Sequence, residues 1–371
     1  MSQQTLEPYF KVLKKYRLEP DYIEDYGKIK KVYTKQGIFA LKQVWYTEEQ
    51  RNQFMLAVKS LHDKGYRHVV PIYFSSDGSH LQSDPSNSNG SEFYLMPWIE
   101  SSQVRADERF MDLMREAARI HKVTEVTGKV NHSYFQHFYD KSKSNIDKRK
   151  LDYERYIEEC EKKIYMSPFE LLYSTHFVQL MRMEDLALNT LEDWYEATKE
   201  KNKDRISICH GNLSPKHLLY DESGHSYLFN FDRTFTASPI YDLLYFFRNA
   251  LYRYPQKVVD ATEWYREYGQ HHQLTDDERL LLFYYLTQTD KIHRIIHQYQ
   301  ADRSISEKNM VVKLQRSIWR MQAAHTFVTQ INESIQQEKN ENLFGEENES
   351  YGAEGSEDNA GSEDIGGSAG N

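Results

Sequence analysis

Four polar positions near the middle of the chain hold the side chains best suited to chemistry: Asn212, His217, Asn230 and Asp232. A neutral amide cannot accept a proton as a general base, and losing such a base typically costs about 100- to 10,000-fold in rate. Magnesium prefers carboxylate oxygens, whereas a histidine nitrogen suits zinc or copper better. Asp232 is therefore the carboxylate in this segment that could hold a divalent cation.

These positions lie on a polar loop and on the hairpin that follows it. Two apolar runs, 218–220 and 227–231, flank the turn-forming segment 221–224, a pattern typical of two short antiparallel strands. The segment 238–242, Ser-Pro-Ile-Tyr-Asp, follows and is expected to open a helix. The simpler alternative is an ordinary hairpin whose polar residues carry no chemistry.

The spacing resembles the catalytic centre of the protein-kinase-like fold, in particular the aminoglycoside and choline phosphotransferases. That family carries His-Gly-Asp, an Asn five residues later, and a hairpin that ends in Ile-Asp-Phe-Asp/Glu. The resemblance places Asn212 at the position of the catalytic Asp. It places three residues at degenerate magnesium positions: His217, Asn230 and Asp232. It also implies structural roles for His210 and for Asp242, whose carboxylate would tie the loop by hydrogen bonds.

A small β-rich lobe is expected upstream. The spacing of apolar residues predicts a helix over 6–17, and a turn then leads into a strand over 38–45. The resemblance places Lys42 on the third strand, where the phosphate-contacting lysine sits. It places Met96 and Ile99 at the hinge, beside an adenine, although a plain strand crossing between the lobes is the simpler interpretation.

The sequence lacks two features that accompany this lysine in active kinases: a glycine-rich loop and an acidic residue on the following helix. The strand pair before Lys42 contains only Gly27, whereas a phosphate-cradling loop needs several glycines. The helix expected over 50–62 contains no Asp or Glu, so an ion-pair partner would have to come from Glu48 or Glu49. We therefore expect no cofactor, with ATP and magnesium bound only if the chain is an active enzyme.

The remainder of the chain is expected to form a large helical lobe. Helices are predicted over 104–123, within 134–194, and over 243–254, 276–299 and 306–338, with a strand over 69–74. The charged insertion 141–163 lies where family members build the acceptor site, but we favour a solvated helix face as the interpretation, because charged helix faces are usually solvated. His293 and His297 are four residues apart and could chelate a metal, yet the sequence reveals no third ligand.

Composition limits the classes of function. Nine acids and no bases follow Lys339, so the rest of the 371-residue chain carries equal numbers of acids and bases despite the net charge of −9. This balance gives no basic field for nucleic acid. The presence of only two cysteines indicates a reducing compartment. The sequence contains no run of about 18 apolar residues, so we expect no membrane span. We expect synthesis in the cytoplasm and a disordered acidic tail over 340–371.

The hinge sequence 94–100, the loop register and the segment 238–242 together resemble the CotS-type spore coat proteins of endospore-forming bacteria, and the YsxE-like branch in particular. The resemblance implies a coat-associated role in sporulation, location in the spore coat and other coat proteins as partners. It implies an α+β, bilobal, protein-kinase-like fold with an N-lobe over 1–99 and a C-lobe over 100–339. Two functions stay open: a pseudokinase with a structural or interaction role, or an ATP- and magnesium-dependent phosphotransferase that acts on a hydroxylated small molecule.

Overall fold

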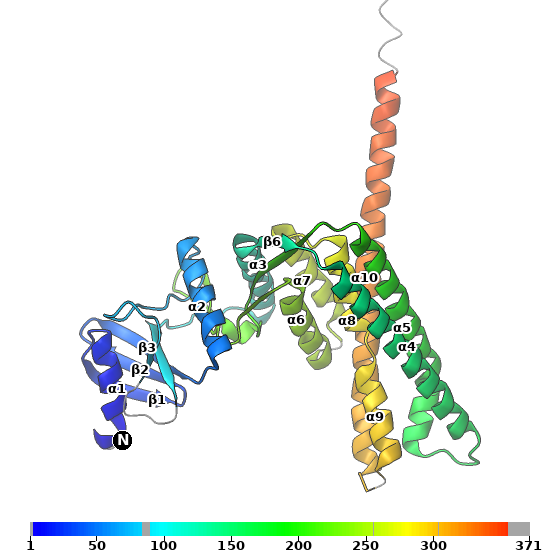
Figure 1. The fold of residues 1–371 in the computed structure, drawn as a ribbon, viewed down its shortest axis with the longest axis horizontal. Coiled ribbons are helices and arrows are strands. Elements are labelled where there is room, and N and C mark those ends of the chain that lie inside the picture. Colours follow the sequence, from blue (N-terminus) through cyan, green and yellow to red (C-terminus); the bar gives the residue numbers. More distant parts are fainter. Residues whose placement is uncertain (1–2, 84–89, 255, 303, 355–371) are drawn as a thin grey trace, which may run out of the picture.

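The protein has two lobes, a small one built on a sheet and a large helical one (Figure 1). The computed structural model describes residues 3–83, 90–254, 256–302 and 304–354. The expected α+β bilobal fold is confirmed. One apolar core runs through both lobes, because Phe54 and Tyr94 of the small lobe belong to the same buried cluster as Leu218 and Leu243 of the large one.

The small lobe is an antiparallel sheet with strand order β1-β2-β3-β5-β4. Its strands are β1 (Pro20–Tyr26), β2 (Ile29–Thr34), β3 (Gly37–Val44), β4 (Gln82–Ser83) and β5 (Glu92–Pro97). Helix α1 (Gln3–Lys15) packs on one face of the sheet through Val12 and Leu13, and α2 (Glu48–Asp63) covers the other face through Phe54. A capping box between Thr47 and Gln50 fixes the start of α2.

The prediction of a strand over 69–74 is wrong. In the described part of the small lobe this segment makes one isolated bridge, between Val69 and Leu228, in which Val70 N–H donates to the carbonyl of Leu228 at 3.0 Å; the N–H of Tyr73 donates to the carbonyl of Leu95 at 2.8 Å. Pro71 lacks an N–H and interrupts a ladder at this point, which explains why apolar composition alone did not give a strand. The segment serves instead as a connector that docks on the large-lobe hairpin.

The large lobe consists mainly of helices. They are α3 (Ala106–Thr124), α4 (His132–Glu161), α5 (Pro168–Lys199), α6 (Ile240–Arg253), α7 (Val258–His271), α8 (Asp276–Thr287), α9 (Asp290–Ala301) and α10 (Glu307–Glu354). The single helix expected over 276–299 is two helices, because the side chain of Thr289 bonds to Tyr153 and Glu184 and stops α8 from continuing. Helix α7 was not predicted.

Two small β-structures hold the polar loop. Strand β7 (Lys203–Cys209) lies between β6 (Val126–Lys129) and β10 (Phe235–Ala237) and leads directly into the loop. After a turn of 3₁₀-helix over Pro215–His217, β8 (Leu218–Tyr220) pairs with β9 (Ser226–Leu228). The predicted hairpin is therefore present, with its second strand ending before Phe229.

Helix α10 extends far from the body of the large lobe (Figure 1). It runs to Glu354 and so includes the first part of the segment for which disorder was predicted. The rest of that segment, 355–371, lies outside the described residues. Within the described ranges, no helix combines the length and the apolar character that crossing a bilayer requires.

Candidate functional site

Asp242 holds the polar loop through the backbone. Its carboxylate accepts hydrogen bonds from the N–H groups of His210, at 2.6 Å, and Gly211, at 2.8 Å, and it contacts Nε2 of His121 at 3.1 Å. Asp242 is fully buried near the start of α6, where a carboxylate also complements the helix dipole. The other ring nitrogen of His121 bonds to the hydroxyl of Tyr268, so the anchor is itself supported from α7.

His210 and Gly211 fix the shape of the loop in different ways. Nε2 of His210 lies 2.9 Å from the carbonyl of Phe229, and burial lowers the pKa of His210 to about 4, so the ring is neutral and donates this bond. Gly211 has φ +75° and lies against the backbone of Arg233, where an added Cβ would be 1.9 Å from the carbonyl oxygen. Only glycine fits this approach.

His217 bonds to two of the other expected site residues, Asn212 and Asn230. Nδ1 of His217 lies 2.8 Å from the carbonyl of Asn212, and its Nε2 lies 2.9 Å from the amide nitrogen of Asn230. Burial lowers the pKa of His217, so the neutral ring donates through Nδ1 and accepts through Nε2. The side-chain oxygen of Asn230 then accepts from the ammonium of Lys42. The lone pairs that might hold a cation are thus directed at protein donors.

Lys42 and Asp232 form an ion pair across the two lobes, with Nζ and Oδ2 2.7 Å apart. The other carboxylate oxygen, Oδ1, accepts hydrogen bonds from the hydroxyls of Tyr46, at 3.0 Å, and Tyr94, at 2.9 Å. We call Lys42, Tyr46, Tyr94, Asn230 and Asp232 the interlobe latch. Three of its members come from the small lobe and two from the large lobe.

Electrostatics keep this latch intact. Burial lowers the pKa of Lys42, and the charge of Asp232 opposes that shift. Burial and the same carboxylate raise the pKa of Tyr46 and Tyr94 well above the usual range, so both hydroxyls stay protonated donors. The rings of both tyrosines pack against Phe54 of α2, at centroid distances of 5.3 and 5.2 Å. Helix α2 thus contributes an apolar side chain that supports the partners of Asp232.

The residues present do not fit magnesium. Among the three degenerate positions, only Asp232 carries an anionic ligand, and it already binds a lysine and two hydroxyls. A Mg²⁺ ion would have to displace Lys42 and give up part of its hydration shell for neutral ligands. Glu48 and Glu49 are exposed and do not serve as the partner of Lys42. The sequence did not reveal that Asp232 would take this role.

A short turn and the hinge segment lie on the side of the cleft where the resemblance places a nucleotide. Tyr26 pairs with Ile29, which leaves a two-residue turn of Gly27 and Lys28 where a phosphate-covering loop would be. At the hinge Met96 is buried in the core, and Ile99 packs partly buried against the same core. The backbone N–H of Trp98 donates to the carbonyl of Ile38 at 3.0 Å, so it is not free to meet an adenine.

A cavity of about 580 Å³ lies beside Asn212. It is bounded by Gln50 and Gln53 of α2, by the polar loop, by Arg233 and by Asn249 of α6. None of the residues that line it comes from the insertion 141–163, which forms part of α4. The insertion that the resemblance places at the acceptor site therefore does not line the loop cavity.

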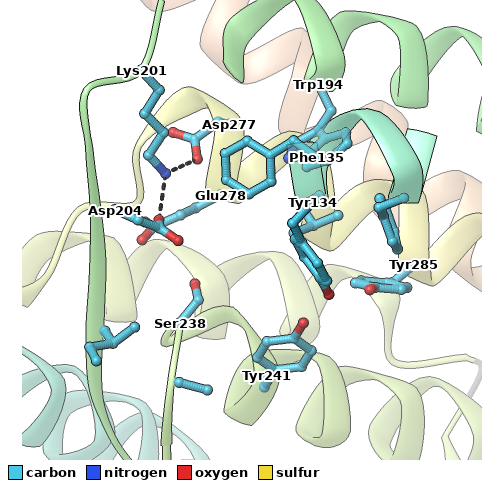
Figure 2. A pocket seen from close by; sticks show the side chains of 14 residues that line it. Tyr134, Phe135, Trp194, Lys201, Asp204, Ser238, Tyr241, Asp277, Glu278 and Tyr285 are labelled. Carbon is cyan, nitrogen blue, oxygen red and sulfur yellow. Dashed lines mark hydrogen bonds and ion pairs between the residues drawn. The ribbon is translucent and has the colours of Figure 1, made fainter. Parts of the chain in front are cut away.

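A second pocket, of about 220 Å³, lies against β7 and the start of α6 (Figure 2). One wall of the pocket is aromatic and consists of Tyr134, Phe135, Trp194, Tyr241 and Tyr285. The facing wall carries three acidic side chains, Asp204, Asp277 and Glu278. The acids are neutralised internally, because Lys201 binds Asp204 at 2.7 Å and also pairs with Asp277, and Arg205 binds Glu278. The sequence did not reveal this pocket, because its walls come from five separate segments.

A bilobal fold with a His-Gly loop, a following hairpin and a third-strand lysine defines a protein of the kinase-like phosphotransferase class. The sequence matches the model of the phosphotransferase enzyme family (APH) over residues 45–283, which is more than half of the chain. The protein therefore belongs to the APH family. Among curated proteins, no sequence matches it.

Solved structures share this fold at low sequence identity. An aminoglycoside phosphotransferase from Alicyclobacillus acidocaldarius is 15% identical with a TM-score of 0.62, and the match covers 88% of this chain and 95% of that one. A microcompartment-associated aminopropanol kinase is 13% identical with a TM-score of 0.50, over 88% and 98% of the two chains. At such identities the likeness establishes the fold alone.

Proposed function

We propose that this protein is a degenerate kinase-fold protein with a structural or interaction role in the spore coat, and not a phosphotransferase. One observation carries the non-catalytic part of the proposal. Asp232, the carboxylate among the degenerate metal positions, is held by Lys42, Tyr46 and Tyr94. The lysine and the acid that would serve a nucleotide therefore satisfy each other.

The coat role rests on the resemblance of the hinge, loop and 238–242 motifs to CotS-type proteins. The chain would be made in the cytoplasm and would join other coat proteins. An interaction role has support from the connection between α4 and α5, where Ile164 and Tyr165 are 91% and 89% exposed. Two adjacent, almost fully exposed apolar side chains at a projecting tip suit contact with another protein.

Titration calorimetry with ATP and magnesium chloride tests the non-catalytic proposal. We expect no metal-dependent heat from the wild-type protein and none from Lys42→Met, which removes the lysine of the latch. A micromolar, magnesium-dependent affinity in the wild type that disappears in Lys42→Met would refute the proposal, because the lysine would then be serving a nucleotide.

Spore fractionation tests the coat role separately. We expect the protein in coat extracts of spores from its host, and a weaker association for the Ile164→Ser, Tyr165→Ser variant. The matched control is Glu158→Ser, Lys162→Ser, which changes two polar residues near the same tip. Absence of the wild-type protein from the coat would refute the role, whatever the calorimetry shows.

The competing function is an ATP- and magnesium-dependent phosphotransferase that acts on a hydroxylated small molecule. It is favoured by the cavity beside Asn212 and by membership of a family of phosphotransferases. Activity would require the latch to open so that Asp232 could leave Lys42 and bind a metal. Release of ADP that depends on both magnesium and an added hydroxylated amine, and that is lost in Asp232→Asn, would establish this function.

A further inference from the structure

A group of metal-ligating side chains lies far from the polar loop, between α4 and α9. Nε2 of His293 is 2.9 Å from Oδ2 of Asp152, Nε2 of His297 is 3.4 Å from the same oxygen, and the two Nε2 atoms are 3.0 Å apart. The third side chain of this group, which the sequence did not reveal, is Asp152, 141 residues from His293.

The two helices bring these atoms together by simple geometry. His293 and His297 are four residues apart, so they project from the same face of α9. Asp152 faces them from α4, and a cavity of about 150 Å³ adjoins all three side chains. Beneath them the ring of His293 packs edge-on against Tyr153 at a centroid distance of 5.7 Å, which restricts the imidazole.

The separations match a metal-binding geometry. A tetrahedral zinc ion with bonds of about 2.0–2.1 Å has ligand atoms about 3.3 Å apart. The three observed distances of 2.9, 3.0 and 3.4 Å lie close to that edge length. A neutral imidazole carries one proton, so at most two protons are available for three mutual contacts, whereas one cation satisfies all three lone pairs.

We propose that Asp152, His293 and His297 bind a divalent transition metal of the zinc type. Two imidazole nitrogens and one carboxylate oxygen favour zinc over magnesium or calcium, and they leave a fourth position for water. The His297 side chain is 53% exposed, whereas Asp152 and His293 are 18% exposed, so the ion has an entry path from solvent and two inner ligands that are largely shielded.

The charges around the site permit a cation. Arg149, the nearest buried cation on α4, is already paired with Glu184, at 2.8 Å, and with Asp290, at 2.8 Å. Arg155 lies 3.7 Å from Asp152 but is 73% exposed and can turn away. Glu159 lines the same cavity and adds negative charge.

The bound ion would have a structural role. It would join α4 to α9, two helices that are distant in sequence, and a cross-link that closes a long loop restricts the unfolded chain most. It is independent of nucleotide binding and so stands whether or not the proposed function does. A ligand that binds only the folded chain stabilises it in proportion to the logarithm of its concentration over Kd.

Calorimetry and differential scanning with zinc chloride on the metal-free full-length protein test this proposal. We expect one equivalent of zinc per chain and a rise in Tm, and a cobalt(II) titration should give the visible absorption of tetrahedral coordination. Since loss of a supporting contact alone costs about 10- to 100-fold in affinity, loss of a direct ligand should weaken binding at least about 100-fold. This loss is expected in His293→Gln, His297→Gln and Asp152→Asn.

The matched control is His225→Gln. His225 also lies beside a carboxylate, with Nδ1 3.2 Å from Oδ2 of Asp221, but this exposed pair has two members instead of three. The control should keep wild-type affinity and the cobalt spectrum. Because His297 is half-exposed, His297→Gln should fold normally, which circular dichroism checks. Equal zinc affinity in wild type and His297→Gln, or no zinc binding in the wild type, would overturn the proposal.

Discussion

Replacement of Asp232 by Asn tests how much the interlobe latch contributes to the free energy of unfolding. The change keeps the size of the side chain but leaves the ammonium of Lys42, which is 7% exposed, without its anionic partner. Removing one member of a buried pair costs about 3–5 kcal/mol. Asp232 is 25% exposed and Asn230 still accepts from Lys42, so we expect a loss of about 2–3 kcal/mol in the free energy of unfolding.

The loss should depend on pH in a definite direction. Burial lowers the pKa of Lys42 in the folded state, and removal of Asp232 takes away the charge that opposes this shift. Between the folded pKa and the unfolded value the unfolded chain binds more protons, so the free energy of unfolding rises with pH. The deficit of Asp232→Asn relative to wild type should therefore be largest near neutral pH and should shrink as the pH approaches 10.5.

Urea unfolding monitored by circular dichroism, at several pH values, gives the required free energies. The control is the double variant Lys42→Met, Asp232→Asn, which removes both charges and should be more stable than Asp232→Asn alone. A double variant that is less stable than Asp232→Asn, or a deficit that grows with pH, would show that the two side chains are not energetically coupled as argued.

Three further outcomes follow from the site and the helical lobe. Asn212→Asp with Asn230→Asp should give no ADP release in a coupled assay, because Lys42 would still pair with Asp232 and the phosphate loop would still be a two-residue turn. Gly211→Ala should cost at least about 2 kcal/mol by urea unfolding, because its φ is +75° and its Cβ would strike backbone, whereas Gly128→Ala should be neutral. Arg149→Ala should cost about 3–5 kcal/mol, because it leaves the fully buried carboxylate of Glu184 without its cationic partner; a loss below 1 kcal/mol would contradict this.

Much of the fold followed from local sequence patterns. Apolar spacing and turn residues were sufficient for α1, α3, α6 and the β8–β9 hairpin, because each has a clear period or boundary. Helix α7 carries the same signal, with Val258, Ala261, Trp264 and Tyr268 buried at helical spacing, and it could have been predicted.

Other features depend on contacts that no local pattern contains. The break between α8 and α9 has no Gly or Pro and is set by bonds from Thr289 to residues of α4 and α5. The three-residue strand β10 is too short to carry a period. The partner of Lys42 and the third residue beside His293 and His297 both lie more than 100 residues away in sequence, so only the folded chain reveals them.

The latch has a mechanical consequence. Kinase-fold enzymes need their lobes to separate and close as substrate enters and product leaves. Here a salt link, two phenolic bonds and a continuous apolar core cross the hinge line. Parting the lobes would expose the shared core and break the ion pair, so any opening of the cleft has to overcome both.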